Sequence, residues 1–158
     1  MEKKHLDSDL SIPLVIDLDG TLLLTDTLHE SIIIFLKKNP FLNFFLLLLW
    51  LIKGKARFKE LISDQVKLNV ETLPYNETFL NFIKKEREKG RKLILCTAAN
   101  KRIANDIAKY LNIFDEVYSS TGVLNLSGES KFTTLKGRFG EKGFIYAGNS
   151  HDDIAVWR

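Results

Sequence analysis

Apolar residues gather into short runs along the chain, and longer segments with helical spacing separate these runs. Four runs are rich in branched or aromatic side chains and lack helical periodicity, which is typical of buried strands: residues 13–19, 91–97, 115–120 and 143–148. Amphipathic segments lie between them, one after Asn76, one that Asn100 can cap, and one that begins near Lys131. This alternation predicts an α/β fold, in which helices cover both faces of a parallel sheet.

The spacing of the predicted strands is uneven. More than seventy residues separate the first strand from the second, whereas a single crossover helix needs far fewer. We therefore expect an inserted helical cap at residues 27–73. Residues 1–26 and 74–158 would then form the α/β core.

One segment of the predicted cap, residues 41–52, is apolar at every position except Asn43. As a helix it would extend roughly 18 Å, which is well short of the roughly 30 Å hydrocarbon core of a bilayer. Cations flank it on both sides, with Lys37 and Lys38 before it and Lys53 and Lys55 after it. Two interpretations stay open: a helix that lies at the surface of an anionic membrane, or a buried core helix or domain contact.

Composition and charge exclude several classes of protein. The net charge of +3 is mild and spread along the chain, so we expect no nucleic-acid partner. The single cysteine, Cys96, excludes a disulfide framework and is expected to point into the core. The polar first residues lack the apolar centre of a signal peptide, and we expect a cytoplasmic protein.

Polar side chains follow the ends of the predicted strands, where an open α/β sheet binds its ligands. Two like charges, Asp17 and Asp19, stand at the tip of the first apolar strand, which destabilises a fold unless a cation lies among them. The other candidates come from the later strand ends and from one helix start: Thr97, Ala98, Lys131, Asn149 and Asp153. Carboxylates, an amide, a hydroxyl and a lysine in one place suit Mg²⁺ and a phosphate group.

The sequences "DLDGT", "LCTAAN", "LSGESK" and "YAGNSHDD" occur in this order and resemble the four motifs of the haloacid dehalogenase superfamily of phosphohydrolases. The resemblance covers nearly the whole chain. It implies a Rossmann-like core with strand order 3-2-1-4, a helical cap after the first motif, and hydrolysis of a phosphate monoester through an aspartyl-phosphate.

The resemblance also implies residue roles. Asp17 would be the nucleophile, and Asp19 would protonate the leaving alkoxide and then activate water. The phosphoryl oxygens would contact the backbone amides around Leu18 and Ala98 and the side chains of Thr97 and Lys131. The Mg²⁺ ligands would come from Asp17, Asp19, Asn149 and Asp153.

The fourth motif departs from the superfamily pattern, because this chain has Asn149 where an aspartate is usual. A neutral amide is expected to weaken Mg²⁺ binding, and Asp152 is an alternative ligand. A phosphomutase and a non-catalytic domain that docks on a membrane or partner stay open as alternatives.

Further features resemble the phosphatase-like N-terminal domains that are fused to UbiA-type polyprenyl transferases: "LPYNE", the apolar segment followed by basic residues, and the last motif with its following "VW". This resemblance implies a lipid-linked substrate at the cytoplasmic face of a membrane. Residues 41–59 would meet the membrane or a fused transferase domain. It also implies that the core continues beyond "DIAVWR".

Overall fold

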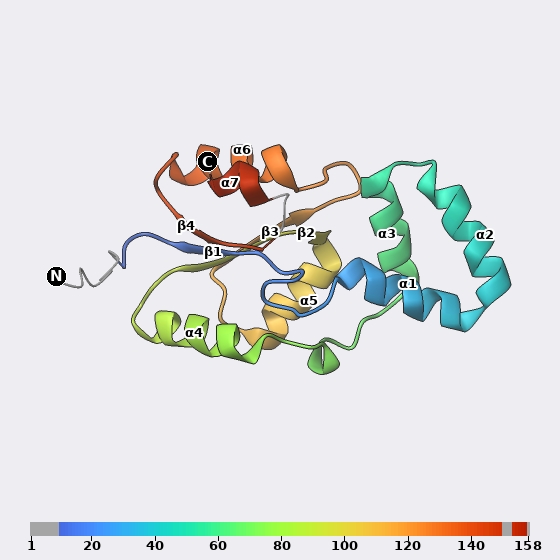
Figure 1. The fold of residues 1–158 in the computed structure, drawn as a ribbon, viewed down its shortest axis with the longest axis horizontal. Helices are drawn as coiled ribbons and strands as arrows, with labels where there is room; N and C mark the ends of the chain where they lie inside the picture. The colour runs from blue at the N-terminus through green and yellow to red at the C-terminus, as the bar shows by residue number, and fades with distance from the viewer. Residues whose placement is uncertain (1–9, 150–152, 158) are drawn as a thin grey trace.

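The computed structural model describes residues 10–149 and 153–157. Its centre is a sheet of four parallel strands, whose bounds are β1 Leu14–Ile16, β2 Leu93–Asn100, β3 Glu116–Ser120 and β4 Ile145–Ala147. The strands lie in the order β3-β2-β1-β4 (Figure 1). The predicted α/β fold class and the predicted strand order are both confirmed.

Side chains alternate between the two faces of the sheet, and each face has its own apolar cluster. Leu14 and Ile16 belong to the cluster under α4 (Glu77–Glu88) and α5 (Lys101–Leu111). Val15 and Cys96 belong to the cluster under α6 (Gly128–Phe139) and α7 (Ile154–Trp157). The two helix pairs lie on opposite sides of the sheet (Figure 1). Cys96 is fully buried, as the sequence predicts.

Short polar side chains determine where the helices begin. The side chain of Asn76 accepts an N–H of the first turn of α4, and Asn100 does the same for α5. Helix α6 begins at Gly128, three residues before Lys131, because Ser127 and Ser130 form a capping box. Lys131 therefore lies inside the first turn of α6 rather than at its start.

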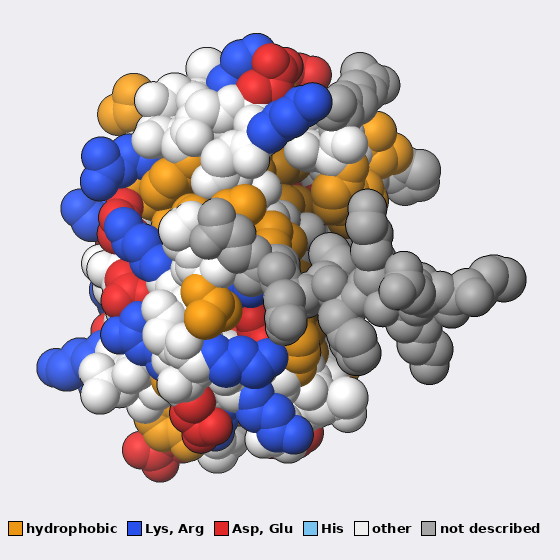
Figure 2. All heavy atoms as spheres, turned by 90° about the vertical axis from the view of Figure 1, so that its left-hand side faces the viewer, with side chains coloured by type: hydrophobic (Ala, Val, Ile, Leu, Met, Phe, Trp, Pro, Cys, Tyr) orange, Lys and Arg blue, Asp and Glu red, His pale blue; other side chains and the backbone are white. Residues whose placement is uncertain are grey.

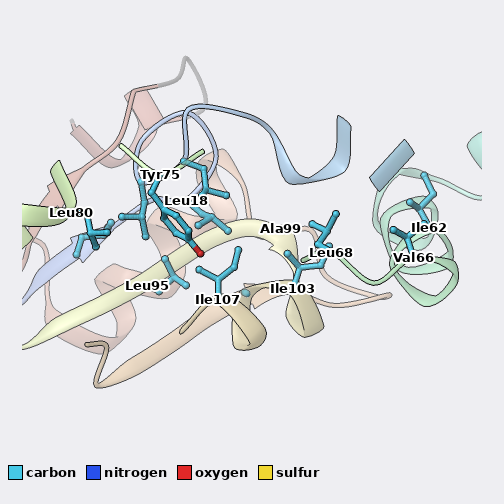
Figure 3. Packing of buried hydrophobic residues seen from close by; sticks show 14 of the residues in the cluster. Leu18, Ile62, Val66, Leu68, Tyr75, Leu80, Leu95, Ala99, Ile103 and Ile107 are labelled. Carbon is cyan, nitrogen blue, oxygen red and sulfur yellow. The ribbon is translucent and has the colours of Figure 1, made fainter. Parts of the chain in front are cut away.

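Four α-helices lie between β1 and β2 in the chain, and we call the first three the cap helices: α1 Thr27–Lys38, α2 Pro40–Leu51 and α3 Lys55–Gln65. They form one end of the molecule, and a 3-10 turn at Val70–Thr72 leads back to the sheet (Figure 1). Ile62 of α3 and Val66, which directly follows this helix, continue the apolar core toward Leu68 and Ile103 (Figure 3). The division into two domains stays a prediction.

No helix within residues 10–149 and 153–157 is long and apolar enough to cross a membrane. The far end of the molecule from the cap helices carries Lys, Arg, Asp and Glu side chains interspersed with one another (Figure 2).

Candidate active site

The strand register brings the polar strand ends together. Ile16 pairs with Leu95 on one side and with Ala147 on the other, so β1 and β4 end at the same level, while β2 continues past them from Leu95 to Asn100. The N–H of Asp17 donates to the carbonyl of Ala147 at 2.9 Å. Asp17 and Gly148 thus directly follow β1 and β4, and Thr97 lies beside them in the extended last part of β2, which ends at Asn100 and not at Thr97 as the sequence predicts.

Lys131 joins the carboxylates of this edge. Its Nζ lies 2.8 Å from Oδ1 of Asp17, 3.0 Å from Oδ1 of Asp153 and 2.7 Å from the hydroxyl of Tyr146. Tyr146 also donates to Asp153. Lys131, Asp17 and Asp153 are all buried. Lys131 therefore supplies a cation to the strand-end carboxylate of Asp17, but its second carboxylate partner is Asp153 and not Asp19.

Burial and ion pairing act in opposite directions in this cluster. Burial raises the pKa of Asp17 and outweighs the lowering effect of the Lys131 ammonium. Burial alone would lower the pKa of Lys131, but the carboxylates of Asp17 and Asp153 together raise it. Lys131 therefore stays charged, and it holds Asp17 at the edge of the sheet.

Asp19 lies at the same strand end but has different partners. Its Oδ1 accepts the backbone N–H of Thr27 at 2.8 Å, which ties it to the first turn of α1. Burial raises its pKa to about 6, and the hydrogen bond from Thr27 opposes this rise. A carboxyl group with a pKa near neutrality can both give and take a proton.

We expect the Asp19→Asn variant to be more stable than the parent chain near neutral pH, by up to about 3 kcal/mol in the free energy of unfolding. The folded pKa of Asp19 is about 6 and its ordinary value is 3.8, so this group favours the fold only while it is protonated. The contribution of Asp19 to the free energy of unfolding is complete below about pH 4, and it is lost as the pH rises through about 6. Urea titrations in EDTA should show a higher free energy of unfolding for Asp19→Asn than for the parent chain at about pH 7.5, and equal values at about pH 4. The same difference at both pH values would contradict a raised pKa of Asp19.

Asn149 packs against the turn that follows β1. Its Nδ2 donates to the carbonyl of Gly20 at 2.6 Å, and its Oδ1 accepts the hydroxyl of Thr21 at 3.3 Å. Gly20 has φ +76°, and a Cβ there would lie 2.6 Å from Nδ2 of Asn149. The backbone N–H of Asn149 donates to Oδ2 of Asp153 at 3.1 Å. Asn149 thus links the first and fourth motifs.

The end of β2 is held from two sides. The Oγ1 of buried Thr97 accepts the N–H of Ala99 at 3.0 Å, which leaves its own proton for donation. The carbonyl of Ala98 accepts Nζ of Lys59 at 2.7 Å. Both ends of the peptide group between Ala98 and Ala99 are therefore held, and one of the holding groups, Lys59, comes from cap helix α3. Lys59 also donates to Oδ1 of Asn125 at 3.2 Å.

The structure brings most of the predicted site residues to one edge. Asp17, Lys131 and Asp153 are in direct contact, and Asn149 touches Asp153 through its backbone. Asp152 lies outside the described residues. Within residues 10–149 and 153–157, no three His, Cys, Asp or Glu side chains are grouped in a way that could hold a metal ion.

Two residues of the site were not predicted from the sequence. Tyr146 lies inside a strand run, where an aromatic residue is expected for packing alone. The sequence signal that could have identified Tyr146 is that the hydroxyl of a buried tyrosine needs a polar partner. Lys59 lies on an amphipathic cap helix, and lysines are mostly exposed. Only the packing of α3 against the strand ends shows that it is buried.

A parallel sheet of this order, with carboxylates and a lysine at its carboxyl edge, defines an α/β enzyme whose site lies at the strand ends. The sequence model of the haloacid dehalogenase-like hydrolase family matches residues 14–158. The chain belongs to this family, as its four motifs predict.

Other known proteins are similar to this chain. The uncharacterized protein y4nM of Sinorhizobium fredii is 38% identical over 99% of the chain, which spans 30% of the length of that protein. Among solved structures, a protein of unknown function from Bordetella pertussis has a TM-score of 0.64 at 15% identity, over 91% of this chain and 84% of that one. A substrate-bound phosphoserine phosphatase has a TM-score of 0.59 at 15% identity, over 93% and 81%. The two structures support the fold.

Proposed function

We propose that this chain is a Mg²⁺-dependent phosphomonoester hydrolase that works through an aspartyl-phosphate on Asp17. The observation that carries the proposal is the position of Asp17: its carboxylate follows the central strand β1 and contacts Lys131 at 2.8 Å. A nucleophile, a cation for the phosphoryl oxygens and a separate carboxyl group, Asp19, stand on one edge of the sheet. Membership of a hydrolase family supports this assignment.

The proposed reaction has two steps. An oxygen of Asp17 attacks phosphorus, the ester P–O bond breaks, and the leaving alkoxide takes the proton of Asp19. Asp19 then accepts a proton from water as that water attacks the aspartyl-phosphate, which releases inorganic phosphate and restores Asp17. The N–H of Thr27 keeps Asp19 oriented throughout, because it holds Oδ1 at 2.8 Å.

Phosphate binding is assigned to groups around the ends of β1 and β2. The Thr97 hydroxyl already accepts the N–H of Ala99, so its proton is oriented for donation to a phosphoryl oxygen. The ammonium of Lys131 and the backbone amides of Leu18 and Ala98 are the other proposed donors. Such fixed donors stabilise the charge that develops on the transferring group.

Mg²⁺ would be held by oxygen atoms alone: the Asp17 carboxylate, the Asp19 backbone carbonyl and the Asn149 side chain. An all-oxygen set suits this hard cation. Both oxygens of Asp153 accept hydrogen bonds from protein donors, so its proposed share in the metal site is to position Lys131 and the backbone of Asn149. When bound, Mg²⁺ would neutralise phosphoryl charge and orient the substrate.

We expect the Asn149→Asp variant to bind Mg²⁺ on the order of tenfold more tightly, because a full charge replaces a neutral amide. Without Mg²⁺ the variant should be less stable than the parent chain, since a carboxylate at this position could not donate to the carbonyl of Gly20. Melting temperatures across a Mg²⁺ titration test both statements without any activity. Equal Mg²⁺ dependence in both chains would contradict Asn149 as a ligand. Asp115→Asn, at the other end of the sheet, is the control.

We expect the Lys59→Met variant to lose about tenfold in kcat with little change in global stability, because the peptide group between Ala98 and Ala99 loses its partner from the cap. Lys59→Arg should recover part of the rate, since arginine can also donate to the Ala98 carbonyl. The exposed Lys55 on the same helix provides the matched control, Lys55→Met. An unchanged kcat in Lys59→Met would show that this contact only packs the cap.

We extend the proposal to the substrate and its place. A cavity of about 490 Å³ lies between α3 and the start of α5, and polar side chains such as Glu60, Asp64, Asn100 and Arg102 line it. Such a lining suits a hydroxyl-rich leaving group, for example a sugar. The apolar surface of α2 supports a lipid-linked phosphate ester at the cytoplasmic face of a membrane, where the exposed side chains within residues 41–59 would meet the bilayer or a fused transferase domain.

The decisive experiment is hydrolysis of an aryl phosphate with Mg²⁺, followed by a borohydride quench. Hydride reduces an aspartyl-phosphate to homoserine and releases phosphate, so mass spectrometry should find the modification at residue 17. Phosphate transfer to an added sugar alcohol, rather than to water, would favour a phosphomutase. Neither turnover nor modification in a folded chain would favour a non-catalytic docking domain.

A further inference from the structure

Helix α2 presents a continuous apolar stripe to solvent. Six exposed side chains recur at spacings of three and one along the helix, which places them on one face: Phe41, Phe44, Phe45, Leu48, Leu49 and Ile52. Phe41 is 83% exposed and Ile52 is 84% exposed. A contiguous apolar surface of this kind marks a site of interaction.

The opposite side of α2 carries the one polar residue of the helix. Asn43 is buried, and its Nδ2 donates to the backbone carbonyl of Phe35 in α1 at 2.6 Å. A surface helix of a water-soluble protein normally has the reverse arrangement, with its polar residues outside. Because the outer face of α2 is more apolar than its inner face, this outer face is suited to an apolar surrounding.

The stripe belongs to a helix that is firmly attached to the cap. Leu47 is buried in the core, and the ring of Trp50 stacks on Phe35 with centroids 5.2 Å apart. The side chain of Asn39 caps the helix at its start. The orientation of the stripe is therefore fixed by packing on the inner side.

Charge identifies the kind of surface that α2 would meet. From residue 31 to residue 59 the chain contains no acidic residue. The exposed lysines Lys37 and Lys38 end α1, while Lys53 follows α2 and Lys55 begins α3. Cations at both ends of an apolar stripe match anionic lipid headgroups around an acyl surface. A second copy of the chain would bring the same lysines toward one another.

We infer that α2 lies in the plane of an anionic bilayer, with its apolar stripe among the acyl chains and its flanking lysines at the headgroups. At twelve residues the helix is roughly 18 Å long, so it rests on the membrane rather than crossing it. In Figure 1, α2 is the outermost cap helix, and the sheet lies on the other side of α1 and α3. Docking through α2 would leave the strand ends uncovered by lipid.

The test is sedimentation of the 158-residue chain with vesicles of phosphatidylcholine alone or with 30% phosphatidylglycerol. The Phe45→Gln/Leu49→Gln pair removes two side chains of the stripe, and Phe82→Gln, on α4, is the matched control because Phe82 is also half exposed. Lys53→Gln/Lys55→Gln removes flanking charge. In a Trp50→Phe/Trp157→Phe background, Phe45→Trp places the remaining tryptophan in the stripe, where it reports insertion by a blue shift of its emission.

We expect the parent chain to bind anionic vesicles. Binding should fall at least tenfold in the Phe45→Gln/Leu49→Gln variant, and it should also fall in the Lys53→Gln/Lys55→Gln variant and in high salt. The Phe82→Gln variant should bind as the parent chain does. Circular dichroism and melting temperatures must show that the variants fold. Failure of the folded parent chain to bind anionic vesicles would overturn the inference. A dimer that the Phe45/Leu49 pair abolishes, without vesicle binding, would assign the stripe to a second copy instead. No readout depends on turnover, so these outcomes are independent of the phosphatase proposal.

Discussion

The Asp17→Asn variant is expected to hydrolyse an aryl phosphate at least about a thousandfold more slowly than the parent chain. An amide is a poor nucleophile, and the neighbouring carboxylates that the structure describes have other partners: Asp153 contacts Lys131 and Tyr146, and Asp19 contacts Thr27. The measurement is kcat at saturating Mg²⁺. Glu88→Gln, at an exposed position at the end of α4, should keep the full rate.

The fold of Asp17→Asn should survive, since Lys131 keeps its contact with Asp153 at 3.0 Å. Loss of turnover in a chain with an unchanged melting temperature would then place the defect in the chemistry. Turnover close to that of the parent chain would remove Asp17 from the mechanism, and with it the proposed aspartyl-phosphate.

The Lys131→Met variant is expected to lose both turnover and stability. Lys131 lies between two buried carboxylates, and without it Asp17 and Asp153 would be buried like charges with no cation between them. Removal of one partner from a buried ion pair costs about 3–5 kcal/mol in the free energy of unfolding. For a chain of this size that corresponds to a fall of roughly 10 °C in melting temperature.

Lys136→Met is the matched control, because Lys136 lies on the same helix but is exposed and pairs with Glu141. It should change the melting temperature little. The double variant Lys131→Met/Asp153→Asn should recover part of the lost stability, since it removes one of the two carboxylates. A melting temperature for Lys131→Met equal to that of Lys136→Met would contradict the role assigned to the buried cluster.

The strand ends of this site could be predicted from the sequence because motif and fold reinforce one another there. "DLDGT" after an apolar strand places Asp17 and Asp19 at the carboxyl edge, and parallel order brings the fourth motif beside them. Lys131 was expected at the start of its helix, but the capping serines place the helix start three residues earlier, at Gly128. The assigned roles of these residues stay predictions.

Contacts between distant elements could not be predicted in the same way. Lys59 reaches Ala98 across 39 positions, and neither residue has a local signal for this contact. The face of α2 that packs against the cap could not be predicted either, because a helix that is apolar at eleven of twelve positions has no polar face to orient it. Asn43 would be placed toward water by its polarity, yet it faces Phe35, since the carbonyl of Phe35 needs a donor there.

Cys96 has a practical consequence of another kind. It is the one cysteine of the chain, it is fully buried beneath α6 and α7, and burial raises its pKa to about 12. A thiol reagent can therefore react with it only when the sheet opens, so the rate of labelling reports how often the central strands are exposed. The labelling rate of Cys96 thus measures opening of the sheet without any added probe. A ligand that binds at the strand ends should lower this rate.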